Sequence, residues 1–296
     1  MSKIFAAFFL IVAAVMLWQH MRYLNARRDN VLDRQSMMYS SESLHVATFF
    51  EVSEGEDVVE KLKQLRKETD GIDGVQWIYA GMAGVGIESK QIENGAWNAA
   101  ILQQYPSRQV YESISSSDAY RKSLAAFPNH HSIGIRRPWL LNLAIPQLLL
   151  GLRFVDVLRG GWTVDDFVKD TQNPVPESTG GADGPGKLRE LAAINPRAVL
   201  IFNFLKDGTA EQQAANKSYG LTMLTRMAAL AHGPMHIGKT VTLDGDASFD
   251  TAVFVYYPGP VYMADMVEST FFRSIVGGKQ PGDTLVVMTV PILDRL

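Results

Sequence analysis

The 296-residue sequence predicts an α+β fold built from two copies of one module, preceded by a membrane-spanning helix. Residues 97–121 align without a gap to residues 249–273, at a constant offset of 152 residues (249 against 97, 273 against 121). Both segments contain an aromatic residue, an apolar strand, Tyr-Pro, an amphipathic helix and an aromatic-Arg pair in the same order. A repeat of this length indicates two copies of a domain rather than a solenoid.

The composition excludes several classes of site. The net charge is -3 and no basic stripe runs through either copy, so we expect no nucleic-acid partner. The chain has no cysteine, which excludes disulfides, thiolate catalysis and cysteine-ligated metals. Gly81, Gly84 and Gly86 do not have the spacing of a dinucleotide fingerprint, and the sequence before Lys279 lacks the Walker pattern. We therefore expect no metal or nucleotide cofactor.

The amino terminus predicts a membrane anchor. Residues 4–18 form an uninterrupted apolar run, and extending it through Tyr23 gives the ~20 residues that span a bilayer. We assign residues 1–24 to the anchor and the polar residues 25–43 to a stalk. A cleaved signal peptide and a buried core helix are the alternatives, and the run ends without the small-residue cleavage site of a signal peptide.

Basic residues orient this anchor. Only Lys3 precedes the apolar run, whereas Arg22, Arg27 and Arg28 follow it. The positive-inside rule then places the globular part of a single-pass membrane protein in the cytoplasm. Short amino-terminal anchors often break this rule, because a large following domain can be exported regardless of nearby charge.

Hydrophobic patterning predicts the elements of the first copy, residues 44–137. Residues 44–52 are rich in β-branched and aromatic types, which favour a strand. Residues 54–69 begin with acids and continue with basic residues, and their apolar positions recur at helical spacing. The remaining elements are expected at residues 81–92 (strand), 97–104 (strand), 106–119 (helix) and 132–136 (strand).

The second copy, residues 195–296, repeats this order. Strands are expected at residues 198–205, 236–243, 251–257 and 284–290, and helices at residues 210–231 and 261–275. Each copy therefore has the β-α-β-β-α-β order of a ferredoxin-like fold. Because one such unit leaves a sheet face open, we expect the two ferredoxin-like repeats to form one intrachain pseudo-dimeric barrel.

Residues 138–194 have no counterpart in the repeat and are expected to be an insert. Residues 145–159 predict a helix with Pro146 in its first turn, a narrow polar stripe and a wide apolar face. That face either covers the barrel or lies in the membrane interface, where nearby arginines would meet anionic lipid. Residues 173–186, rich in Gly and Pro, predict a flexible linker.

Four residues of the second copy are candidates for catalysis. His232 and His236 flank Gly233-Pro234, which breaks any helix, so a shared metal is not expected. Tyr257 ends the third strand of the copy, and Arg273 follows in the second helix. A neutral imidazole could take a proton from a phenol or an α-carbon, while Arg273 holds the resulting anion. The alternative is that these residues only line a rim or cap an element.

The order of strand, Tyr-Pro and helix with Met263 and Met266 before the aromatic-Arg pair resembles the dimeric α+β barrel superfamily. The likeness is greatest over residues 249–291 and is nearest to a bacterial domain-of-unknown-function family close to the YCII-like proteins and antibiotic-biosynthesis monooxygenases. This resemblance implies that two β-α-β-β-α-β units form a barrel. Members of the superfamily include cofactor-free oxygenases, haem-degrading enzymes, isomerases and ligand binders, and no catalytic residue set is common to them.

We therefore expect a membrane-anchored protein that binds or transforms a small apolar or aromatic molecule between sheet and helices. Its expected partners are the lipid bilayer and this ligand. The alternative is a non-catalytic interaction or scaffold subunit that joins another protein in a membrane complex. Six aromatic residues motivate the first hypothesis: Trp77, Tyr79, Trp97, Tyr219, Tyr256 and Tyr257.

Overall fold

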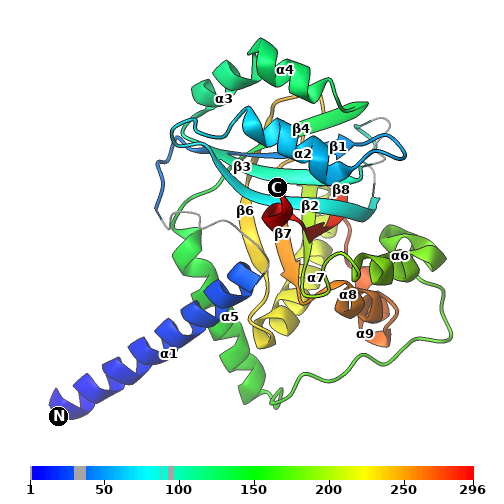
Figure 1. Ribbon diagram of the computed structural model, residues 1–296. Coiled ribbons are helices and arrows are strands. Elements are labelled where there is room, and N and C mark those ends of the chain that lie inside the picture. Colours follow the sequence, from blue (N-terminus) through cyan, green and yellow to red (C-terminus); the bar gives the residue numbers. More distant parts are fainter. Residues whose placement is uncertain (1, 30–37, 88, 93–96) are drawn as a thin grey trace.

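A computed structural model describes residues 2–29, 38–87, 89–92 and 97–296 of the chain. Within these residues, eight antiparallel strands close into one barrel in the order β1-β3-β2-β8-β5-β7-β6-β4 (Figure 1). The strands are β1 (Leu44–Glu51), β2 (Gln76–Ile87), β3 (Ala99–Tyr105), β4 (Asn129–Arg136), β5 (Val199–Lys206), β6 (Pro234–Thr242), β7 (Thr251–Tyr257) and β8 (Asp283–Pro291). The prediction of an α+β barrel is confirmed.

The barrel is closed by two seams between the halves of the chain. β4-β1-β3-β2 come from the first half and β8-β5-β7-β6 from the second, so both halves have the same strand order. β2 pairs with β8, with Gly81 opposite Pro291, and β4 pairs with β6, with Ile133 opposite Thr242. Closure pairs the backbone groups that open edge strands would expose.

Helices cover the outside of the barrel (Figure 1). Those of the first half are α2 (Val58–Lys67), α3 (Arg108–Ser115) and α4 (Asp118–Leu124), and those of the second half are α7 (Ala210–Ala229), α8 (Pro260–Val267) and α9 (Thr270–Val276). The segment between the halves contains α5 (Leu141–Leu158), two 3-10 turns (Glu177–Thr179 and Gly181–Asp183) and α6 (Gly184–Leu191), and the chain ends in the 3-10 turn Leu293–Arg295.

The amino-terminal helix α1 (Ser2–Asp29) projects from the barrel (Figure 1). Its apolar residues 4–17 are exposed, whereas Tyr23 is buried and donates a hydrogen bond from its hydroxyl to the Pro234 carbonyl. The helix includes residues 25–29, which the sequence assigned to the stalk, and residues 30–37 of that stalk lie outside the described residues. Two described helices, Ile4–Arg28 and Leu141–Leu158, have the length and composition of a membrane span.

Each predicted helix after a Tyr-Pro is in fact two helices. Ser117 lies between α3 and α4 and caps α4, because its side chain accepts a hydrogen bond from the amide of Tyr120. Ser269 caps α9 in the same way, accepting from the amide of Phe272. A serine side chain satisfies an amide that lacks a partner at a helix start, and therefore favours a new helix at that position. Both breaks lie at the offset of 152 residues (269 against 117).

Two further expectations were wrong in their boundaries. β2 begins at Gln76 rather than residue 81, because the β-favouring residues Trp77 to Tyr79 belong to the strand. The predicted linker is ordered over residues 177–186, which form the two 3-10 turns and the start of α6. A Cβ at Gly184 would lie 2.1 Å from the Thr179 carbonyl oxygen, so this glycine permits a close backbone approach rather than flexibility.

Aromatic side chains from both halves of the chain pack together inside the barrel. Phe202 of β5 is fully buried, and its ring centroid lies 5.5 Å from that of Phe49 and 5.7 Å from that of Tyr79. Both partners belong to the first half, whereas Phe254, at 4.6 Å, belongs to the second. Strand alternation explains the arrangement, because Leu200, Phe202 and Phe204 share one face of β5. The two halves therefore share one hydrophobic core.

We predict that Phe202→Ala lowers the free energy of unfolding by about 3–5 kcal/mol, because it leaves a cavity among packed rings. In a double-mutant cycle with Phe49→Ala, the two effects should be coupled by about 0.5–1.5 kcal/mol, the range of an aromatic pair. Urea unfolding of the single and double variants measures both quantities. Strictly additive effects would contradict a core shared between the halves.

Candidate functional site

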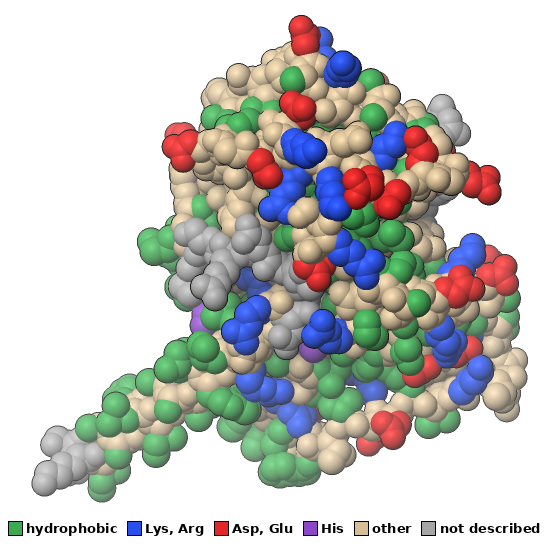
Figure 2. Space-filling view, in the orientation of Figure 1, with side chains coloured by type: hydrophobic (Ala, Val, Ile, Leu, Met, Phe, Trp, Pro, Cys, Tyr) green, Lys and Arg blue, Asp and Glu red, His purple; other side chains and the backbone are tan. Residues whose placement is uncertain are grey.

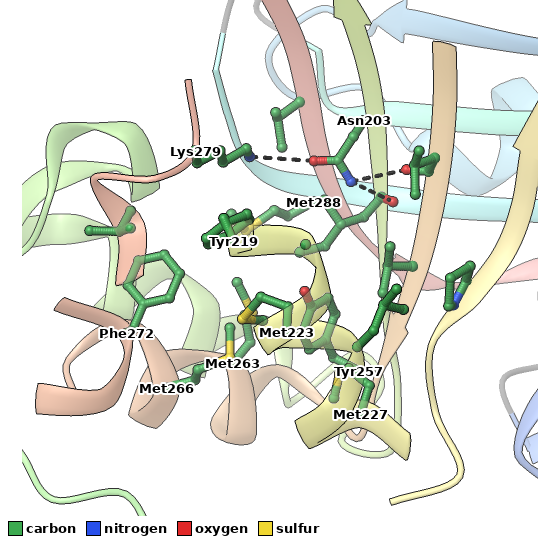
Figure 3. A pocket seen from close by; sticks show the side chains of 18 of the residues that line it. Asn203, Tyr219, Met223, Met227, Tyr257, Met263, Met266, Phe272, Lys279 and Met288 are labelled. Atoms are coloured by element: carbon green, nitrogen blue, oxygen red, sulfur yellow. Dashed lines mark hydrogen bonds between the residues drawn. The ribbon is translucent and has the colours of Figure 1, made fainter. Parts of the chain in front are cut away.

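A cavity of about 300 Å³ lies between the outer face of the second half of the sheet and its helices (Figure 3). Strands β5, β6, β7 and β8 form its floor, and α7, α8 and α9 cover it. Its wall is mostly apolar and includes five methionines. They are Met223, Met227, Met263, Met266 and Met288.

The local structure explains why these side chains meet. Residues of β5 and β7 alternate between the barrel core and the outer face, so Asn203 and Tyr257 point outward where Phe202 and Tyr256 point inward. Met223 and Met227 are four residues apart on α7, which places them on one side of that helix. Methionine is unbranched and polarizable, so a wall of methionines can adapt to ligands of different shape.

Two polar groups meet within this apolar wall. The Nζ of Lys279 lies 3.4 Å from the Oδ1 of Asn203. The Asn203 amide donates its Nδ2 to the Val253 carbonyl at 3.0 Å, and this bond fixes Oδ1 toward the lysine. The Lys279 residue as a whole is partly exposed, but burial of its amine lowers the pKa to about 8.

Lys279 is held in place by the connection between α9 and β8. Its backbone amide donates to the Val276 carbonyl at 2.9 Å, and a Cβ added to the preceding Gly278 would lie 3.4 Å from the Cβ of Tyr219 on α7. Burial raises the pKa of Tyr219 to about 12, so this phenol is neutral at pH 7 and can donate a hydrogen bond. No motif in the sequence around Lys279 marks it as a site residue, because its surroundings come from segments that are distant in sequence.

The four predicted catalytic residues do not share this cavity. Tyr257 lines it, and burial keeps its pKa above the ordinary value. Arg273 lies partly buried on α9, and its Nε has no acceptor among the described residues. His232 lies in a separate surface hollow, where its Nδ1 is 2.8 Å from the Leu230 carbonyl oxygen.

His236 is inside the barrel. Its side chain is fully buried, its ring centroid lies 5.0 Å from that of His45, and neither ring nitrogen has a hydrogen-bond partner among the described residues. Burial lowers its pKa well below the ordinary value, and the Arg137 guanidinium lowers it further. Burial also lowers the pKa of His45 to about 3. Both imidazoles are therefore neutral at pH 7, as the proposed proton abstraction requires, but His236 does not line the cavity.

The described residues contain no group of three or more His, Asp or Glu side chains placed to hold a metal ion. The acidic segment 244–250 belongs to the turn between β6, which ends at Thr242, and β7, which begins at Thr251. Within it, Asp244 accepts a hydrogen bond from the amide of Ser132 at 2.7 Å. This carboxylate thereby ties the turn to β4.

No protein-family model matches the chain, and no curated protein matches it. Solved structures that are similar include an "anthrone oxidase-like protein" (10% identity, 85% of this chain and 92% of that chain, TM-score 0.43). Others are a "putative monooxygenase" from Lactobacillus acidophilus NCFM (9%, 84% and 94%, TM-score 0.41) and a mutant chlorite dismutase from Candidatus Nitrospira defluvii with cyanide (9%, 88% and 95%, TM-score 0.42). These neighbours belong to the dimeric α+β barrel superfamily. At such scores they assign no activity to this chain.

We predict that the protein loses stability as the pH falls from about 7 to about 5. In the unfolded chain, His45 and His236 bind protons near pH 6.5, whereas their buried imidazoles in the folded protein resist protonation. Each of them can therefore change the free energy of unfolding by at most about 1.4 kcal/mol per pH unit. His236→Leu should reduce this slope relative to wild type. Urea unfolding in detergent micelles measures the slopes. Equal slopes for wild type and His236→Leu would contradict the prediction.

Proposed function

We propose that this chain is a membrane-anchored barrel protein that holds one small apolar or aromatic molecule with an acidic group in the cavity beneath α7. The observation that supports this function is the amine of Lys279, buried in an apolar wall with Asn203 as its polar neighbour at 3.4 Å. The methionines and Tyr257 would contact the apolar body of the ligand. A carboxylate or phenolate would contact Lys279.

The electrostatics favour an anionic group at this position. With a pKa of about 8, the amine is mostly protonated at pH 7, so the cavity contains a cation that burial makes costly. A bound anion would compensate that cation and return the pKa toward its ordinary value. Ligand binding near pH 8 would therefore be accompanied by proton uptake.

The proposed architecture is a pair of ferredoxin-like repeats in which the second copy keeps the ligand site. The shared strand order and the matched helix breaks at Ser117 and Ser269 support the repeat. In the first copy, the connection after α4 contains Phe127, which is buried with its ring centroid 4.4 Å from that of Phe50. An aromatic core residue thus lies where the second copy has the loop of Lys279.

The proposed ligand class can be tested with two probes of the same shape, 2-naphthoate and the neutral 2-naphthylmethanol. We expect Lys279→Met to weaken naphthoate binding about tenfold or more, the effect of losing a hydrogen bond to a charged group. The neutral probe should bind within about twofold of wild type, since the apolar wall is unchanged. Isothermal titration calorimetry of the full chain in micelles measures both affinities.

Lys187→Met is the matched control, because Lys187 is exposed on α6 and does not line the cavity. Equal losses for both probes in Lys279→Met would indicate a collapsed cavity rather than a lost charge contact, and would contradict the proposal. If wild type binds neither probe and mass spectrometry finds no molecule extracted with it, the scaffold alternative is favoured.

A further inference from the structure

The outer face of α5 is apolar and has no partner within the described chain. Seven exposed residues of this helix fall within an arc of about 140° at the 100° per residue of an α-helix. They are Leu143, Ala144, Leu148, Gly151, Phe154, Val155 and Leu158. In this fully described helix, Gln147 is the one polar side chain within the arc, and it is only partly exposed. We propose that α5 lies in the membrane interface with this face among the lipid acyl chains.

The opposite face of α5 is packed against the protein. Ile145 and Leu149 are buried and form one cluster with Tyr23 of α1 and Ala228 of α7. Because this side is fixed, α5 cannot turn its apolar face inward to hide it. The same packing excludes α5 as a free transmembrane span, although its length would allow one.

The charges of α5 are neutralised within the protein. Arg153 pairs with Asp156 at 2.7 Å, and its guanidinium also donates to the carbonyls of Gly161 at 2.6 Å and Trp162 at 2.9 Å. These bonds satisfy carbonyl groups that follow the helix and would otherwise need water. The side chains of Leu158 and Trp162, at the end of α5 and just after it, are 70% and 72% exposed. Tryptophan is a residue type that favours the bilayer interface.

A neighbouring feature identifies lipid, rather than another protein, as the occupant. α1 packs against α5 at Tyr23, and the part that projects from the barrel has exposed residues 4–18, which are all apolar (Figures 1 and 2). Phe8 and Leu10 of α1 are exposed by 60% and 71%. Trp18 stacks beneath the Arg22 guanidinium at 4.9 Å, an aromatic and basic pair suited to the headgroup region. A bilayer that contains the projecting part of α1 therefore adjoins α5.

This placement has a consequence that depends on the proposed function. Leu224 and Ile237 line the cavity and also pack against the cluster that contains Ile145 and Leu149 of α5. A single helix would then separate the ligand cavity from the bilayer, which suits a ligand that dissolves in lipid. The membrane contact of α5 itself does not depend on any ligand.

The absence of native cysteine allows site-specific labelling of the full chain. Phe154→Cys, Leu158→Cys, Leu10→Cys and the control Glu112→Cys would each carry an environment-sensitive fluorophore, and all four positions are exposed. The proteins would be reconstituted into vesicles of phosphatidylcholine and phosphatidylglycerol that contain lipid with a nitroxide at a shallow or a deep acyl position. Quenching of the fluorophore reports direct contact with lipid.

We expect shallow nitroxide to quench labels at Phe154 and Leu158 at least about twofold more than the label at Glu112, as for an interfacial helix. The label at Leu10 should be quenched most by the deep nitroxide. Quenching at Leu10 alone would overturn the proposal, because α1 would then be the only membrane contact. Blue-shifted emission at Phe154 and Leu158 without quenching would also overturn it, since a protein would then cover α5. Failure of naphthoate binding would leave this result unaffected.

Discussion

Closure of the barrel is the constraint on which the rest of the structure depends. The β2–β8 and β4–β6 pairs join the two halves, and neither half has a closed sheet without them. Closure forces one face of every strand inward, where Phe49, Phe202 and Phe254 pack as a single core. It also forces the other face outward, where each half must cover it with its own helices.

This division explains where a ligand can be held. Aromatic and aliphatic side chains of one core pack together in the described interior, and the cavity lies outside the sheet, under the helices of the second half. The two halves use the outer face differently. Phe127 belongs to a packed core around Phe50 in the first half, whereas Lys279 and the methionines surround open space in the second.

Much of the fold could be predicted from the sequence, because strand patterning and the repeated Tyr-Pro segment are local signals. The closed barrel was expected on that basis. The helix breaks at Ser117 and Ser269 were missed because an amphipathic pattern continues across them, and only the cap hydrogen bonds distinguish two helices from one. The ordered structure of residues 177–186 was missed because a segment that needs glycine for close backbone contacts is as rich in glycine as a flexible linker.

The site was harder to predict, because it depends on the side of the sheet that each residue faces. His236 and Tyr257 are both near strand ends, but a bulge between Pro234 and His236 and the alternation of β7 place them on opposite sides of the barrel wall. Lys279 lies in a connecting loop without any motif, and its surroundings come from α7 and β5, distant in sequence. Burial of a charge by distant segments leaves no local pattern.

The ionisation of Lys279 tests the proposed site most directly. Nuclear magnetic resonance of the full chain with isotope-labelled lysine can follow its amine across pH, with assignment from the signal that Lys279→Met removes. The proposed site predicts a pKa of about 8 without ligand and a higher value when 2-naphthoate is bound. A pKa near the ordinary value of about 10.4, unchanged by naphthoate, would show that the amine is solvated and would contradict the site.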